Sequence, residues 1–140
     1  MKKIFKVQKK KLFHQIIGAV LLDINSSKAT YSGLNNVGPT ISVHQVGFQM
    51  DKGYMVIENP FTLTIAGKSF DSSDLEIFNI LRKLIGSRID QAWFEKEEIN
   101  IIFNNAHLNV SLKAKDFVSP EAGTYTSKDN STFIVFTAEN

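Results

Sequence analysis

The chain has 140 residues, a hydrophobic share of 43% and eleven phenylalanines, which predicts one folded globular domain over residues 1–140 rather than a disordered chain. Cysteine is absent, so disulfides, thiolate metal sites and cysteine nucleophiles are excluded, and a reducing, cytoplasmic location is expected. The net charge of +2 is unevenly distributed, because residues 1–11 hold six lysines and no acid, whereas the remainder holds ten basic and fourteen acidic side chains.

The basic start of the chain is predicted to be a solvated, partly frayed arm. Ile4, Phe5 and Val7 alternate with lysines, so an edge strand is the alternative. Lysines in such an arm can also attract phosphates by releasing counterions. They are Lys2, Lys3, Lys6, Lys9, Lys10 and Lys11.

The apolar run "IIGAVLL" at residues 16–22 is interpreted as part of a buried strand over 16–25 that ends at "NSS". A signal peptide is the weaker alternative, because no convincing cleavage site follows the run. Seven apolar residues are too few to span a bilayer, so no membrane association is expected.

Three strands are predicted before the middle of the chain, after a loop at 32–40 that is rich in glycine and asparagine. The first covers 41–50 and shifts its alternation near Gly47, which suggests an irregularity there. The strands "YMVIE" and "FTLTIA" follow, separated by Asn59-Pro60, because proline cannot donate to a central ladder.

A helix is predicted over residues 74–85. Ser73 and Glu76 have the spacing of a capping box, and Gly86 provides the stop. The apolar positions recur at helical spacing and should form a stripe that packs on the sheet, namely Leu75, Phe78, Leu81 and Leu84 or Ile85.

The remainder of the chain predicts further strands. "RIDQAWF", "EINIIF" and "HLNVSLKA" alternate around turns at 95–98 and at Asn104-Asn105. Residues 116–131 are interpreted as a long polar connection, and "TFIVFTA" as a strand inside the sheet. The predicted fold is therefore α+β: a mainly antiparallel, twisted sheet of about six to eight strands with one principal helix on one face.

No catalytic, metal-binding or cofactor motif stands out. His14, His44 and His107 lack any paired metal-ligand spacing, and no hydrolase elbow, P-loop or G-x-G-x-x-G occurs. We therefore predict no catalytic residue, no metal ligand and no cofactor.

Acidic residues around the only tryptophan give the one candidate site. A solvated hairpin tip is the simplest interpretation, and catalysis by paired carboxylates, with Glu58 as a possible neighbour, the least favoured. The third interpretation is a partner-binding edge, with an aromatic anchor inside an electrostatic rim. Its candidate residues are Asp90, Trp93, Glu95, Glu97 and Glu98.

The segments "GYMVIENPFTLTI" and "SSDLEIFNILRKLIGSRIDQAWFEKEEINIIFNNAHLNVSLKAKDFVSPEAG" resemble a group of small bacterial α+β domains, over about residues 41–125. Some proteins of this kind look like immunity proteins of polymorphic or contact-dependent toxin systems. The resemblance implies a non-enzymatic function with a protein partner, a cationic toxin domain, and it implies no catalytic residues.

The favoured function is accordingly the stoichiometric neutralisation of a cognate bacterial toxin. An inhibitor with carboxylates associates faster with a cationic nuclease and can occupy a site built for phosphates. The alternative is a module that binds a small molecule or a nucleic acid through the sheet face or the lysine-rich start, although nucleic acid is the less expected partner.

Overall fold

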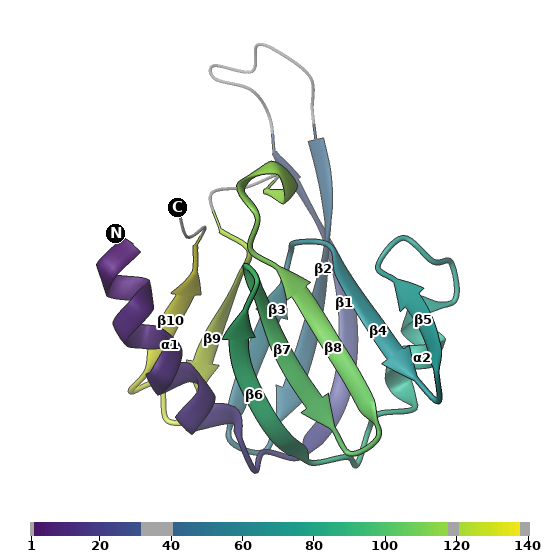
Figure 1. Cartoon of the computed structure of the whole chain (residues 1–140), viewed down its shortest axis with the longest axis horizontal. Helices are drawn as coiled ribbons and strands as arrows, with labels where there is room; N and C mark the ends of the chain where they lie inside the picture. The colour runs from purple at the N-terminus through teal and green to yellow at the C-terminus, as the bar shows by residue number, and fades with distance from the viewer. Residues whose placement is uncertain (1, 32–40, 118–120, 138–140) are drawn as a thin grey trace.

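The computed structural model describes residues 2–31, 41–117 and 121–137. For residues 2–8, 27–31 and 41–44 it describes the backbone only. The described chain is a mainly-β, α+β arrangement of two five-stranded antiparallel sheets and two short helices (Figure 1). Sheet 1 has the order β1-β2-β3-β9-β10, and its strands are β1 Leu21–Tyr31, β2 Ile41–Met50, β3 Gly53–Ile57, β9 Gly123–Ser127 and β10 Phe133–Phe136.

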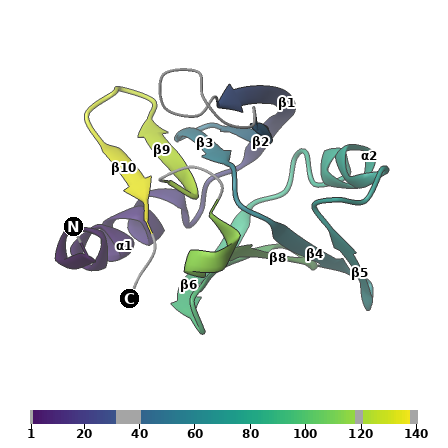
Figure 2. The same cartoon turned by 90° about the horizontal axis from the view of Figure 1, so that it is seen from above.

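Sheet 2 has the order β5-β4-β8-β7-β6 and lies face to face with sheet 1, as the view from above shows (Figure 2). Its strands are β4 Phe61–Ile65, β5 Lys68–Asp71, β6 Ile89–Glu95, β7 Glu98–Phe103 and β8 Ala106–Ser111. The helices of the described residues are α1 Lys2–Ile16 and α2 Ile77–Arg82, and the 3₁₀ turn η2 covers Ala114–Asp116.

The prediction of a single sheet is wrong. The reason lies after β3, where the chain crosses from sheet 1 to sheet 2. β3 pairs with β2 on one side and with β9 on the other, so its neighbour in sequence has no free edge to join. The backbone N–H groups of Glu58 and Asn59 both donate to the carbonyl of Ala122. Pro60 then turns the chain into β4, which pairs with β8 and begins the second layer.

Most of the predicted strands are confirmed, and the turns at 95–98 and 104–105 lie where the sequence indicates. The irregularity predicted near Gly47 is absent: the β1–β2 register shifts between Leu21 and Asp23 and runs evenly past Gly47. The glycine instead makes room for a neighbour. A Cβ there would lie 2.0 Å from the Tyr54 hydroxyl, which donates to Asn25 Oδ1 at 2.9 Å.

Two errors concern the start of the chain. The basic arm is neither frayed nor an edge strand: residues 2–16 form α1, built from good helix formers, with Leu12 and Ile16 buried one turn apart. The strand predicted over 16–25 accordingly begins only at Leu21. It runs on through "NSS" because β2 pairs with it along its whole length.

The polar connection predicted over 116–131 contains β9. Thr124 and Thr126 are half-buried and Tyr125 is fully buried, so polar residues alternate with the core. The β9–β10 turn is closed by Asp129 Oδ1, which accepts hydrogen bonds from Ser127 Oγ (2.8 Å) and from the Ser131 backbone and hydroxyl. These bonds, those from Ser131 first, lower the pKa of Asp129 to about 2.

β10 is the edge strand of sheet 1 rather than an interior one. Phe133 is 60% exposed, while Ile134 and Phe136 face the core. α1 lies against β10 and against β6, the edge of sheet 2, so it closes one open side between the two layers (Figures 1 and 2).

The predicted helix over 74–85 is confirmed in its centre but is wrong at both ends, since α2 covers only Ile77–Arg82. Ser73 and Glu76 form no capping box, because Ser73 donates to Asp71 and the Glu76 backbone N–H donates to Asp74 Oδ1. The predicted stripe is confirmed at Leu81 and Leu84, which are buried, and wrong at Leu75, which is 98% exposed. Ile77 is buried in its place. α2 packs near β1.

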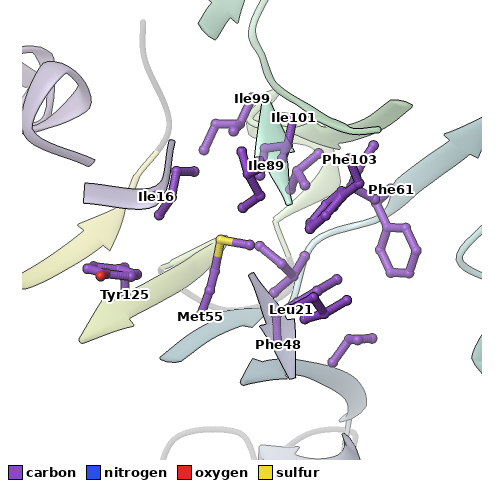
Figure 3. Close-up of a cluster of buried hydrophobic side chains, with 14 of the residues drawn as sticks. Ile16, Leu21, Phe48, Met55, Phe61, Ile89, Ile99, Ile101, Phe103 and Tyr125 are labelled. Carbon is purple, nitrogen blue, oxygen red and sulfur yellow. The ribbon is translucent and has the colours of Figure 1, made fainter. Parts of the chain in front are cut away.

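Side chains from both sheets fill the space between the layers. Phe48 of β2 and Phe103 of β7 are fully buried and stack with ring centroids 6.4 Å apart. Figure 3 shows Met55 of sheet 1 pointing into the same cluster as Ile89, Ile99 and Ile101 of sheet 2. At one corner the sheets are joined directly, by a β-bridge between Val20 and Arg88.

We expect Phe103→Ala to lower the free energy of unfolding by about 3–5 kcal/mol, because it removes a buried ring that joins the two layers and leaves a cavity. Phe133→Ala is the matched control and should change that free energy by less than about 0.5 kcal/mol, since its ring is largely in solvent. Urea unfolding followed by circular dichroism measures both variants. Equal losses would contradict the placement of the core.

Candidate binding surface

The surface of sheet 2 that points away from sheet 1 is called here the outer face. Ile99, Ile101 and Phe103 of β7 are buried against sheet 1, so the alternate residues of β7 and their cross-strand partners point outward. The outer face therefore comprises Thr62, Thr64, Ser69, Asp71, Gln91, Trp93, Glu95, Glu98, Asn100, Ile102, His107, Asn109 and Ser111.

One end of the outer face has a row of carboxylates. Glu95 lies directly opposite Glu98 in the β6–β7 ladder, and Glu98 lies opposite Ser111 in the β7–β8 ladder. The Ser111 hydroxyl donates to Asp116 Oδ2, which adds a third carboxylate beside the row. Like charges in directly opposed positions destabilise a sheet by a few tenths of a kcal/mol to about 1 kcal/mol.

The middle of the outer face is an aromatic and amide cluster. The Trp93 and His107 rings lie 5.5 Å apart between centroids, and Asn100 beneath them is only 5% exposed. The Oδ1 atom of Asn100 forms a hydrogen bond with His107 Nε2 at 3.0 Å and accepts a second hydrogen bond from the side-chain amide of Asn109. Because an amide oxygen only accepts, His107 carries a hydrogen on Nε2.

The β6–β7 hairpin turns through two residues in the left-handed region. Lys96 has φ 55° and Glu97 has φ 58°, the signs that a type I′ turn requires at both central positions. Such turns favour Asn-Gly, because a side chain with a Cβ is strained at positive φ. The Lys96-Glu97 pair therefore carries a conformational cost and presents both of its charges to solvent.

A polar pocket of about 440 Å³ adjoins the carboxylate row. It lies where β4 and β7 begin and where β5 and β8 end, beside η2. Its walls are Pro60, Phe61, Thr62, Asp71, Ser72, Ser73, Glu98, Asn109, Ser111, Lys113 and Asp116.

The predicted site residues are only partly brought together. Trp93, Glu95 and Glu98 share the outer face, and Glu97 lies at the adjoining turn. Asp90 is exposed at the opposite end of β6, where the register shifts between Ile89 and Gln91, and it lies apart from the others.

Sequence reasoning missed the residues that complete this surface. Asn109 and Ser111 occupy the outward positions of a strand that was predicted, so alternation alone could have indicated them. Asp71 lies on β5, which was not predicted, and Asp116 lies in η2. Their proximity to Glu98 depends on strand order, which has no local sequence signal.

The basic N-terminal segment is less open than its composition suggests. Lys9 is 8% exposed, and its ammonium lies 3.5 Å from the centroid of the Phe94 ring. This cation–π contact holds α1 against β6. Lys10 and Lys11 are exposed on the same helix and are accessible to a polyanion, whereas the buried Lys9 is not.

The histidines lie apart from one another in the sequence, and two of them have described side chains. His14 is exposed on α1, and the side chain of His44 falls outside the described residues. Within the described ranges, no group of three or more histidine, aspartate and glutamate side chains could hold a metal ion. No helix in that part of the chain is both long and apolar enough to cross a bilayer.

A second carboxylate pair lies at the crossing between the sheets. Glu58 is 8% exposed and accepts a hydrogen bond from Gln45 Nε2 at 3.1 Å. Burial raises the pKa of the neighbouring Glu121, and the charge of Glu58 raises it further. This pair lies outside the outer face and the pocket.

No family model, curated protein or solved structure matches this chain.

Replacing Lys96-Glu97 by Asn-Gly should raise the free energy of unfolding by about 1–2 kcal/mol, because both new residues tolerate positive φ. Urea unfolding measures the gain. Lys83→Gly is the control: Lys83 has φ −67°, so glycine gives it no relief and should not stabilise. A loss of stability in the Asn-Gly variant would contradict the turn geometry.

Glu121→Gln should stabilise the protein at neutral pH. A raised pKa means that the folded state holds the proton more tightly, so wild-type stability falls as pH rises through the folded pKa of Glu121. The neutral amide avoids this loss. Thermal unfolding at pH 7.5 and at pH 3.5 should show a gain at the higher pH only, and an equal gain at both would contradict the assignment.

Proposed function

We propose that the protein is a non-enzymatic binding module that neutralises a cationic toxin domain by covering it with the outer face of sheet 2. The observation that carries this proposal is the opposed Glu95–Glu98 pair beside Trp93 on an exposed sheet face. Repulsion between the two carboxylates is relieved when a cation lies between them, so a basic partner regains free energy that the isolated fold loses.

The composition of the outer face supports binding over a broad surface. A large aromatic ring flanked by charged and polar groups is typical of an interface anchor with its rim. Trp93 and His107 are half-buried, so they can lose further surface to a partner without a change in the sheet. The carboxylates lie on strands and can meet a partner without costly ordering.

The described carboxylates also favour a cationic partner over a nucleic acid. Glu95, Glu98 and Asp116 would repel phosphates at this face. Of the three N-terminal lysines whose side chains are described, Lys9 is buried, which weakens the alternative based on the basic start of the chain. The small-molecule alternative draws on the pocket, which is part of the same surface.

The test is charge reversal on the outer face. A toxin domain encoded beside this gene should lose toxicity on co-expression with the wild-type protein, and Glu95→Lys with Glu98→Lys should weaken the rescue. Isothermal titration of the purified proteins should show at least a tenfold loss of affinity, because each attraction becomes a repulsion.

The matched control is Asp23→Lys with Glu76→Lys, which changes net charge equally at exposed positions on β1 and beside α2. It should leave rescue and affinity nearly unchanged. Trp93 is the only tryptophan, so binding should also shift its fluorescence. Full rescue by the folded Glu95/Glu98 variant would contradict the proposed surface.

A further inference from the structure

The pocket beside the carboxylate row has the size of a ligand site. Its volume of about 440 Å³ falls within the range of roughly 300–1,000 Å³ that is typical of pockets for small ligands. Serine, threonine and asparagine side chains share its walls with three carboxylates and one lysine, Lys113. The lining therefore has two more negative than positive charges, with several oxygen acceptors between them.

The carboxylates come from three separate elements. Asp71 ends β5, Glu98 begins β7 and Asp116 closes η2, so the fold places them around the cavity. Two are held by local bonds: the backbone and hydroxyl of Ser73 donate to Asp71, and the hydroxyl of Ser111 donates to Asp116. The bonds from Ser73 also lower the pKa of Asp71, so this carboxyl is ionised at neutral pH.

The distribution of acceptors favours a guanidinium over an ammonium. An ammonium is a compact point charge, whereas a guanidinium directs five N–H donors outward in a plane and can bind separated carboxylates simultaneously. Pro60 is exposed at the pocket and adds an apolar surface along which the methylene stem of such a group can lie, whereas the Phe61 side chain belongs to the core.

We propose that this pocket receives an arginine side chain of the protein partner, with Asp71, Glu98 and Asp116 as the acceptors. The proposal rests on the proposed function, because it takes the partner as the source of the guanidinium. The pocket shares Glu98 with the Glu95–Glu98 pair, so an inserted arginine would also relieve the repulsion within that pair.

The probe is L-argininamide, followed by chemical-shift changes of backbone amides in the ¹⁵N-labelled full chain. Shifts should concentrate at pocket residues such as Ser72, Asn109 and Ser111. Lysinamide, which has the same charge, should bind about three- to tenfold more weakly, because it lacks the planar donors.

Variants separate the site from general charge attraction. Glu98→Gln keeps the shape of the side chain and should weaken argininamide binding about three- to tenfold. The control Asp23→Asn removes one exposed carboxylate on β1 of the other sheet, which is not part of the pocket lining, and should leave binding unchanged. Equal binding of both amides, shifts spread over the whole surface, or an unaffected Glu98→Gln would each overturn the pocket assignment.

The two proposals fail in distinguishable ways. If argininamide does not bind while Glu95/Glu98 reversal still abolishes toxin rescue, the arginine site is wrong and the binding face stands. If argininamide binds the pocket but the neighbouring toxin domain is not neutralised, the guanidinium chemistry holds and the toxin is not its source.

Discussion

The arrangement of the whole molecule depends on β3 being paired on both edges. With β2 and β9 bonded to it, the chain can continue only by leaving sheet 1, which it does at Asn59-Pro60. The second layer then buries its apolar side against the first. The helices occupy the open sides between the layers, so no described helix covers the outer face of sheet 2. The polar surface available to a partner follows from that one topological constraint.

Local patterns predicted the parts of the fold that local physics determines. Turn chemistry and alternation located β2, β3, β4 and the β6–β7–β8 meander, because hairpins need only neighbouring residues. The division into two sheets was missed, since pairing between β3 and β9 joins segments about seventy residues apart. α1 was missed for another reason: its lysines suggested a solvated arm, although Leu12 and Ile16 already had helical spacing.

The candidate site was predictable to a similar extent. Trp93, Glu95 and Glu98 were identified as a group because they lie close in sequence, and the ladder keeps them on one face. Asp90 lies apart from the group, because the register shifts at the start of β6 and composition gives no sign of that shift. Asp71 and Asp116 join the surface only through strand order and η2, which no short motif encodes.

The contact between α1 and β10 joins the first described helix to the last described strand. During synthesis α1 emerges early, but the strand against which it packs begins only at Phe133. The gap between the layers therefore stays open until nearly all of the described chain is available, and contacts so distant in sequence slow folding. A nascent chain of this protein therefore keeps that flank of the core accessible to water until β10 has been synthesised.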